Sequence, residues 1–145
     1  MLSFACFAQY VGLSATQISK LKDYVKTNAD AQKEYNKLSK IAEAALKQEP
    51  NPTDTIWSEG LLANNPKKLK TQQCLQDVKK IYALAMVYAI NDKAVYKNKA
   101  IAYLTAWAAL NKPQGNSIND TKLEELLEGY NLLKSEFDTE QKKLM

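Results

Sequence analysis

Polar side chains gather in one short segment of the chain, from Asn111 to Asp120, between two apolar stretches. Its ten residues include three asparagines, an aspartate, a lysine, a proline and a glycine, which is more than a plain turn requires. Amide, carboxylate and ammonium groups can hydrogen-bond a polar ligand or neutralise an acidic one. The simplest interpretation is a helix connection that ends in a cap, with amides to spare for a binding site.

The composition limits the chemistry that any site in this chain can perform. All 20 basic residues are lysines, so the sequence contains no arginine, and it contains no histidine. It therefore lacks both the side chain that titrates near neutrality and the planar fork that grips a carboxylate or phosphate. A site must use Lys, Tyr, Asn, Asp, Glu, Ser or Thr.

Metal and cofactor chemistry is not expected. The two cysteines, Cys6 and Cys74, do not have the spacing of a zinc site. They could pair in an oxidising compartment, but two small buried or terminal residues are the simpler interpretation. A four-helix-bundle metal site is also not predicted, because the inward Glu-x-x-His pairs are missing.

Charge and hydropathy do not indicate a nucleic-acid partner or a membrane span. A net charge of +4, spread along the chain, permits an acidic polymer but does not indicate nucleic acid. Residues 1–13 are apolar, yet they have no basic leader and are too short to span a bilayer, so they are no complete signal peptide. No other run approaches a membrane span of about 20 residues.

The first half of the chain predicts two helices followed by a long loop. A capping box, Ser14 to Gln17, begins a helix that should run to about Lys26. A second helix has apolar residues at spacings of three and four between residues 31 and 45 and should end near residue 48. Three prolines then predict a loop over 48–71, with Trp57 in its middle and Thr71 as the cap of the next helix.

The second half predicts helices that are unusually apolar. Residues 81–90 and 100–110 contain no charge, so we expect both helices to be covered on nearly every side. A second capping box, Thr121 to Glu124, predicts the start of a fifth helix. Residues 138–145 form a charged tail that could add a helical turn or two, or fray. The fold class is thus all-α, in antiparallel hairpins, and loops 48–71 and 111–120 should lie at the same end.

Residues 82–133 (YALAMVYAINDKAVYKNKAIAYLTAWAALNKPQGNSINDTKLEELLEGYNLL) and the segment 12–46 resemble the alginate-lyase family of polysaccharide lyases. The resemblance covers roughly residues 10–137, so residues 14–137 would form the alginate-lyase-like helical domain. Most of it rests on Trp107, Gly115, Asn116, Asp120 and Thr121. The family's fold implies helical hairpins in an incomplete α/α toroid around a cleft for an acidic polysaccharide, and its members imply a periplasmic or secreted location.

The resemblance also implies a reaction and a set of binding residues. Family members cleave by β-elimination with an Asn-His pair, an Arg and a Tyr that lie beyond the matched part, and this chain has no His or Arg to replace them. We therefore expect binding of an alginate-like polysaccharide without cleavage; Tyr103 or Tyr130 with a lysine is the weaker catalytic alternative. The predicted contacts are two stacking rings, three hydroxyl partners and two lysines for a uronate carboxylate: Trp57, Trp107, Asn116, Asn119, Asp120, Lys112 and Lys122.

Each candidate also has a structural explanation, and the whole chain has an alternative function. Trp107 could be core, Asp120 and Thr121 helix caps, and the lysines solvated surface. A tetratricopeptide-like interaction module would also place aromatics in paired helices, but its 34-residue period is absent. Because a shortened toroid exposes an apolar face, we expect self-association or a partner protein that covers it.

Overall fold

The fold is known from a computed structural model, which describes residues 12–144. Within that range the chain is helical and contains no strand, so the prediction of an all-α fold is confirmed. None of the helices in this range is both long and apolar enough to cross a membrane. In chain order the elements are α1 (Ala15–Thr27), α2 (Ala29–Leu46), α3 (Pro66–Cys74), α4 (Gln76–Asn91), α5 (Ala94–Leu110), α6 (Ser117–Asp120), η1 (Thr121–Leu123), α7 (Glu124–Leu133), η2 (Lys134–Glu136) and α8 (Thr139–Leu144).

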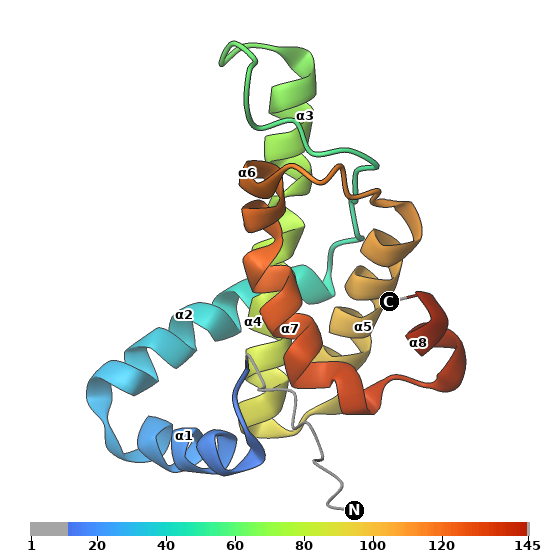
Figure 1. Cartoon of the computed structure of the whole chain (residues 1–145). Coiled ribbons are helices and arrows are strands. Elements are labelled where there is room, and N and C mark those ends of the chain that lie inside the picture. The colour runs from blue at the N-terminus through green and yellow to red at the C-terminus, as the bar shows by residue number, and fades with distance from the viewer. Residues whose placement is uncertain (1–11, 145) are drawn as a thin grey trace, which may run out of the picture.

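Helix α4 lies at the centre of the molecule. It contacts α1, α2, α3, α5 and α7, and Figure 1 shows α2, α5 and α7 arranged around it. Ile81, Leu84 and Val87 are fully buried there, as the uncharged stretch predicts. Helices that pack around one central helix do not by themselves form a ring, and the incomplete toroid stays a prediction.

Helix α5 is less covered than its sequence suggests. One side packs into the core through Tyr103, Leu104 and Trp107, but Ala109 and Leu110 are exposed. The expectation that this helix is covered on nearly every side is therefore wrong. The exposure of Ala109 is explained by its small side chain, which costs little to leave in water, and Leu110 is the last residue of the helix.

The loop before α3 is shorter than predicted, and its cap is a different residue. Asn65 caps α3 by accepting a hydrogen bond from the Lys67 N–H at 3.0 Å, and Pro66 occupies the first helical position. Proline is favoured there because that position needs no donor. Thr71, predicted as a cap, lies inside α3 and is buried. Pro66 therefore begins a helix and does not prevent one.

The ends of the first two helices follow the sequence closely. The Gln17 N–H donates to Ser14 Oγ at 3.3 Å and the Ser14 N–H donates to Gln17 Oε1 at 2.8 Å, so this capping box is confirmed. Asn28 ends α1 and caps α2 by accepting from the Ala31 N–H at 2.9 Å. Helix α2 therefore starts at once, and the two helices form a tight hairpin (Figure 1).

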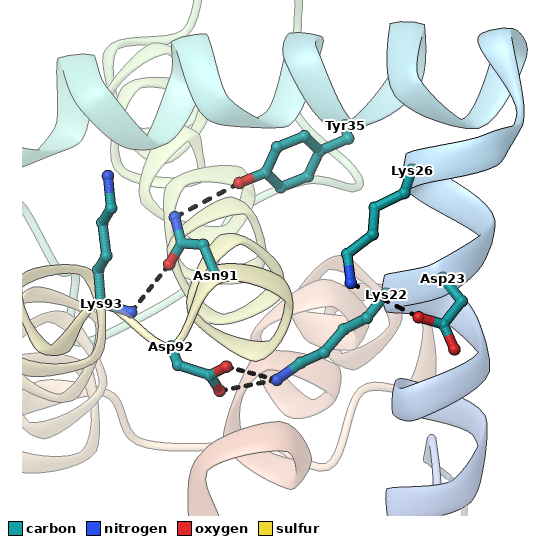
Figure 2. A network of polar contacts seen from close by, with 7 residues as sticks. All are labelled: Lys22, Asp23, Lys26, Tyr35, Asn91, Asp92 and Lys93. Atoms are coloured by element: carbon teal, nitrogen blue, oxygen red, sulfur yellow. Dashed lines mark hydrogen bonds and ion pairs between the residues drawn. The ribbon is translucent and has the colours of Figure 1, made fainter.

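Polar contacts connect this hairpin to the turn between α4 and α5, as Figure 2 shows. Lys22 on α1 forms an ion pair with Asp92 at 2.6 Å, and Asn91 donates to the hydroxyl of Tyr35 on α2 at 3.4 Å. Asp92 ends α4 in the left-handed conformation, with φ at 58°. Because Asp92 is exposed, the ion pair contributes little to stability and mainly orients the hairpin.

The C-terminal tail forms an additional short helix. Asp138 Oδ1 accepts from the Gln141 N–H at 2.8 Å, and Gln141 Oε1 accepts from the Asp138 N–H at 3.0 Å, which is a capping box for α8. Helix α8 contacts α5, and the buried Phe137 precedes it. Of the two alternatives for this tail, the additional helical turns occur.

Gly129 marks the closest approach of α7 to α4 and gives the first testable prediction. A Cβ atom at Gly129 would lie 2.8 Å from Ile81 Cγ2, a branched atom next to the α4 backbone. Gly129→Ala should therefore lower the free energy of unfolding by up to about 2 kcal/mol: overpacking costs about 1–3 kcal/mol, and better helix propensity returns about 1. Urea denaturation measures this loss.

The control is the same change in an Ile81→Ala background, where the clashing methyl group is gone. There Gly129→Ala should be neutral or stabilising. An equal loss in both backgrounds would show that the space next to Ile81 is not the cause.

Candidate functional site

The two loops that sequence analysis placed at one end of the molecule do meet there. The Lys112 N–H donates to the Asp54 carbonyl oxygen at 2.8 Å. Ser58 donates to Asn119 Oδ1 through its hydroxyl, in a short hydrogen bond, and through its N–H at 3.4 Å. The loop before α3 (47–65) and the segment 111–120 therefore form one continuous rim, called the loop rim below.

Trp57 presents its ring on this rim. Its side chain lies on the loop before α3, and the residue is 37% exposed. The backbone N–H donates to Thr71 Oγ1 at 3.0 Å, which fixes the loop to α3. The Lys67 ammonium lies 4.7 Å from the centre of the indole ring, within the range of a cation–π contact. The rim thus combines an accessible aromatic ring with an adjacent positive charge.

Trp107 does not lie on the rim, and its predicted role as a stacking surface is wrong. The residue is 1% exposed within the core between α4, α5 and α7, and its indole N–H donates to Asp77 Oδ2 at 3.2 Å. A ring that is covered on both faces cannot receive a sugar. The core interpretation of Trp107, which sequence analysis left open, is the correct one.

The remaining predicted residues divide into helix-capping and exposed side chains. Asn116 caps α6 by accepting from the Ile118 N–H at 3.0 Å, and Asn119 is buried against Ser58. Asp120 and Lys122 are exposed, and so is the side chain of Lys112. Four of the seven candidates, Lys112, Asn116, Asp120 and Lys122, therefore reach solvent on or beside the same segment, together with Trp57 on the facing loop.

The second predicted capping box is absent. The Thr121 hydroxyl donates backwards to the Ile118 carbonyl oxygen at 2.8 Å, and neither Asp120 nor Thr121 accepts a bond from a helix N–H. Helix α7 begins at Glu124 after one 3₁₀ turn. Thr121 is engaged in this way because the preceding residues already form α6, so no extended residue is available to act as a cap.

The rim is a surface and not a deep cleft. The hollow between its two halves, lined by Ile56, Asn111, Lys112, Pro113, Gln114, Asn119 and Asp120, measures about 10 Å³. That is room for about one water molecule. A sugar chain would have to bind across the outside of the rim, on Trp57 and the exposed polar side chains.

Asp77 organises the core beneath the rim and was missed by sequence analysis. It is fully buried in the first turn of α4. Its Oδ2 accepts from the Asn51 N–H at 2.5 Å and from the Trp107 indole, and its Oδ1 pairs with Lys80 at 3.0 Å. One carboxylate thereby joins α4, α5 and the loop. An aspartate in the first turn of a helix normally lies in solvent and interacts with the helix dipole. The sequence pattern therefore did not indicate that Asp77 is buried.

Tyr103 is a second buried side chain with a polar group near Asp77. Among the described residues its hydroxyl has no hydrogen-bond partner, and the Lys80 and Lys99 ammonium groups lie 5.7 and 5.8 Å from its ring centre. Burial, followed by the charges of Asp77 and Glu49, raises the pKa of Tyr103 to about 12. The phenol is therefore protonated at neutral pH, so Tyr103 is a poor general base.

Cys74 has no chemical role that its surroundings favour. It is buried, and burial raises the pKa of its thiol, which keeps it in the unreactive protonated form. Cys6, its predicted alternative partner, lies outside the described residues. Within residues 12–144 no group of three or more acidic or cysteine side chains is arranged to hold a metal ion.

Comparison with known proteins adds no relative to this picture. Neither a protein-family model, nor a curated protein, nor a solved structure matches the chain.

Proposed function

We propose that this chain binds an acidic polysaccharide of the alginate type across the loop rim and does not cleave it. The observation that carries the proposal is the pairing of Trp57 with Lys67. The indole can stack on the apolar face of a sugar ring, and an ammonium 4.7 Å from its centre can neutralise the carboxylate of a uronate.

The polar side chains on the facing segment support the same ligand. Asn116, Asp120 and Gln114 are exposed and can hydrogen-bond hydroxyl groups, while Lys112 and Lys122 provide two further charges. The resemblance to alginate lyases rests in part on the same segment, through Asn116 and Asp120. Both lines of reasoning favour a polymer of uronates over a neutral glycan.

The absence of cleavage follows from the side chains that the chain lacks. Proton removal beside a uronate carboxylate needs a base of suitable pKa and donors for the developing negative charge, and one missing donor alone costs about a hundredfold in rate. The printed sequence offers no histidine or arginine, and the Tyr103 phenol is held protonated. Binding is therefore the function that these residues favour.

Substitution of Trp57 tests the proposal. Titration calorimetry with oligomers of mannuronate or guluronate should show binding, and both Trp57→Ala and Lys67→Gln should weaken it by about tenfold or more, as loss of a central aromatic or charged contact does. Trp57→Phe should retain much of the affinity. Ultraviolet absorbance should detect no unsaturated product in any sample.

Two controls make the result specific. Lys93→Gln removes an exposed lysine at the distant turn between α4 and α5 and should leave the affinity unchanged. A neutral oligosaccharide of the same length should bind at least tenfold more weakly than the uronates. Equal effects of Lys67→Gln and Lys93→Gln would reduce the interaction to general charge attraction and contradict a defined site.

A protein-interaction module is the second candidate function, and the uncovered side of α5 favours it. Ala102, Ala109 and Leu110 are exposed along that helix, where a second copy of the chain or a partner protein could pack. If no uronate oligomer binds, this candidate takes precedence over the polysaccharide.

A further inference from the structure

The loop and first turns of α3 form an exposed end of the molecule, residues 59–70, called the α3 end below. Figure 1 shows this end extending beyond the other helices, at the top of the view. Two exposed leucines lie on it: Leu62 is 79% exposed and Leu69 is 45% exposed. Apolar side chains of this size are seldom left so open without a partner when they occur together.

The charge of the α3 end has one sign. Lys67, Lys68 and Lys70 follow one another along the start of α3, while residues 60–76 contain no acid and Glu59 stands alone at the edge. The α3 end thus combines three lysines with two exposed leucines, and Lys68 and Lys70 flank Leu69 in the helix. A partner that fits it must offer negative charge and an apolar phase at the same place.

The loop is held in the shape that exposes Leu62. Gly60 adopts φ of +71°, which turns the chain outward, and the Asn65 N–H donates to the Leu62 carbonyl oxygen at 3.0 Å. The Lys68 ammonium donates to the Leu61 carbonyl oxygen at 3.3 Å. These bonds close a turn whose central residues are Ala63 and Asn64, and Leu62 begins this turn, exposed and not packed back against the core.

We propose that the α3 end binds the surface of an anionic lipid bilayer, with Leu62 and Leu69 in the interface and the three lysines at the headgroup phosphates. A bilayer surface combines anionic groups with an apolar layer directly beneath them, which is the combination that this end requires. An acidic polysaccharide offers the charge but no apolar layer for two leucines. The inference goes beyond the proposed function and does not rest on it.

The expected binding is weak and reversible. Each lysine close to an anionic bilayer raises the partition coefficient about fivefold, so three lysines give about a hundredfold. The leucines add a contribution that does not depend on salt, because it comes from removal of apolar surface from water. Binding should therefore fall with ionic strength but keep a part that depends on the leucines.

Co-sedimentation of the full chain with large vesicles tests this. We expect sedimentation with vesicles of phosphatidylcholine and phosphatidylserine, little with phosphatidylcholine alone, and a marked decrease as salt is raised. Leu62→Ser with Leu69→Ser should lower the partition coefficient about tenfold, and Lys68→Gln with Lys70→Gln about twentyfold. Leu110→Ser with Leu127→Ser removes two exposed leucines elsewhere and should leave binding unchanged.

Three results would overturn the proposal. They are no sedimentation with anionic vesicles at low salt, equal binding to both kinds of vesicle, and unchanged binding after the Leu62 and Leu69 substitutions. The last would indicate attraction to any polyanion. Since these variants keep Trp57 and Lys67, the uronate titration separates the two proposals. Loss of vesicle binding with uronate binding intact supports both, whereas unchanged vesicle binding with uronate binding intact rejects only the membrane proposal.

Discussion

Asp77→Ala is expected to lower the free energy of unfolding by about 3–5 kcal/mol. The change leaves two donors without an acceptor, the part-buried Asn51 N–H and the buried Trp107 indole N–H, and an unpaired buried donor costs about 1–3 kcal/mol. The ion pair with Lys80 is lost as well, although that ammonium is partly exposed and can turn to water. Urea denaturation followed by far-ultraviolet circular dichroism measures the loss.

Two variants separate this effect from a loss of charge alone. Asp77→Asn keeps one acceptor oxygen of nearly the same shape, so it should cost less than Asp77→Ala. Asp92→Asn removes the charge of an exposed carboxylate that also pairs with a lysine, keeps a residue type that tolerates the left-handed conformation, and should cost about 1 kcal/mol or less. If Asp77→Ala proved as mild as Asp92→Asn, the buried carboxylate would not be what joins the loop to α4 and α5.

Much of the fold could be predicted because its helices depend on local sequence patterns. The capping box at Ser14, the uncharged run of α4 and the turn before α5 each depend on residues within a few positions of one another. Pro66 shows where this reasoning fails. A proline interrupts a helix in its interior but is favoured at the first helical position. Only the cap residue Asn65 marks Pro66 as a first position, and asparagine is also common in loops.

The candidate site was predicted less well because its parts come from separate segments. Sequence analysis placed loops 48–71 and 111–120 side by side, and the bonds from Lys112 to Asp54 and from Ser58 to Asn119 confirm this. Lys67 could not be recognised in advance, since it meets Trp57 only because Pro66 starts α3 between them. Contacts of this kind depend on tertiary structure and leave no periodic trace.

The two tryptophans also show that tertiary contacts cannot be predicted from local sequence. Both look like candidate stacking rings in the sequence, yet one is accessible and the other is 1% exposed. The distinguishing group is Asp77, thirty residues before Trp107, whose carboxylate accepts the indole N–H and allows that polar atom to be buried. An aromatic residue in an uncharged, apolar helix is therefore better predicted to be a core residue, provided that the fold can supply a partner for its polar atom.

Trp107→Ala should therefore act on stability, by about 3–5 kcal/mol, the usual cost of removing a large aromatic side chain from a packed core. Trp107→Phe keeps most of the volume but leaves Asp77 with one donor fewer, which should cost about 1–3 kcal/mol. Because Trp57 is partly exposed, Trp57→Ala should cost about 1 kcal/mol or less in stability while it weakens uronate binding. Paired denaturation and calorimetry on these variants assign each ring its role.

A double-mutant cycle gives the sharpest form of this test. If the indole and the carboxylate stabilise one another, the cost of Asp77→Ala should be smaller in the Trp107→Phe background than in the native chain, since one of the donors it leaves unpaired is already gone. Additive costs would mean that the two side chains are buried independently. If Trp107→Phe kept native stability but lost uronate binding, Trp107 would instead be part of the binding surface, and its assignment to the core would be wrong.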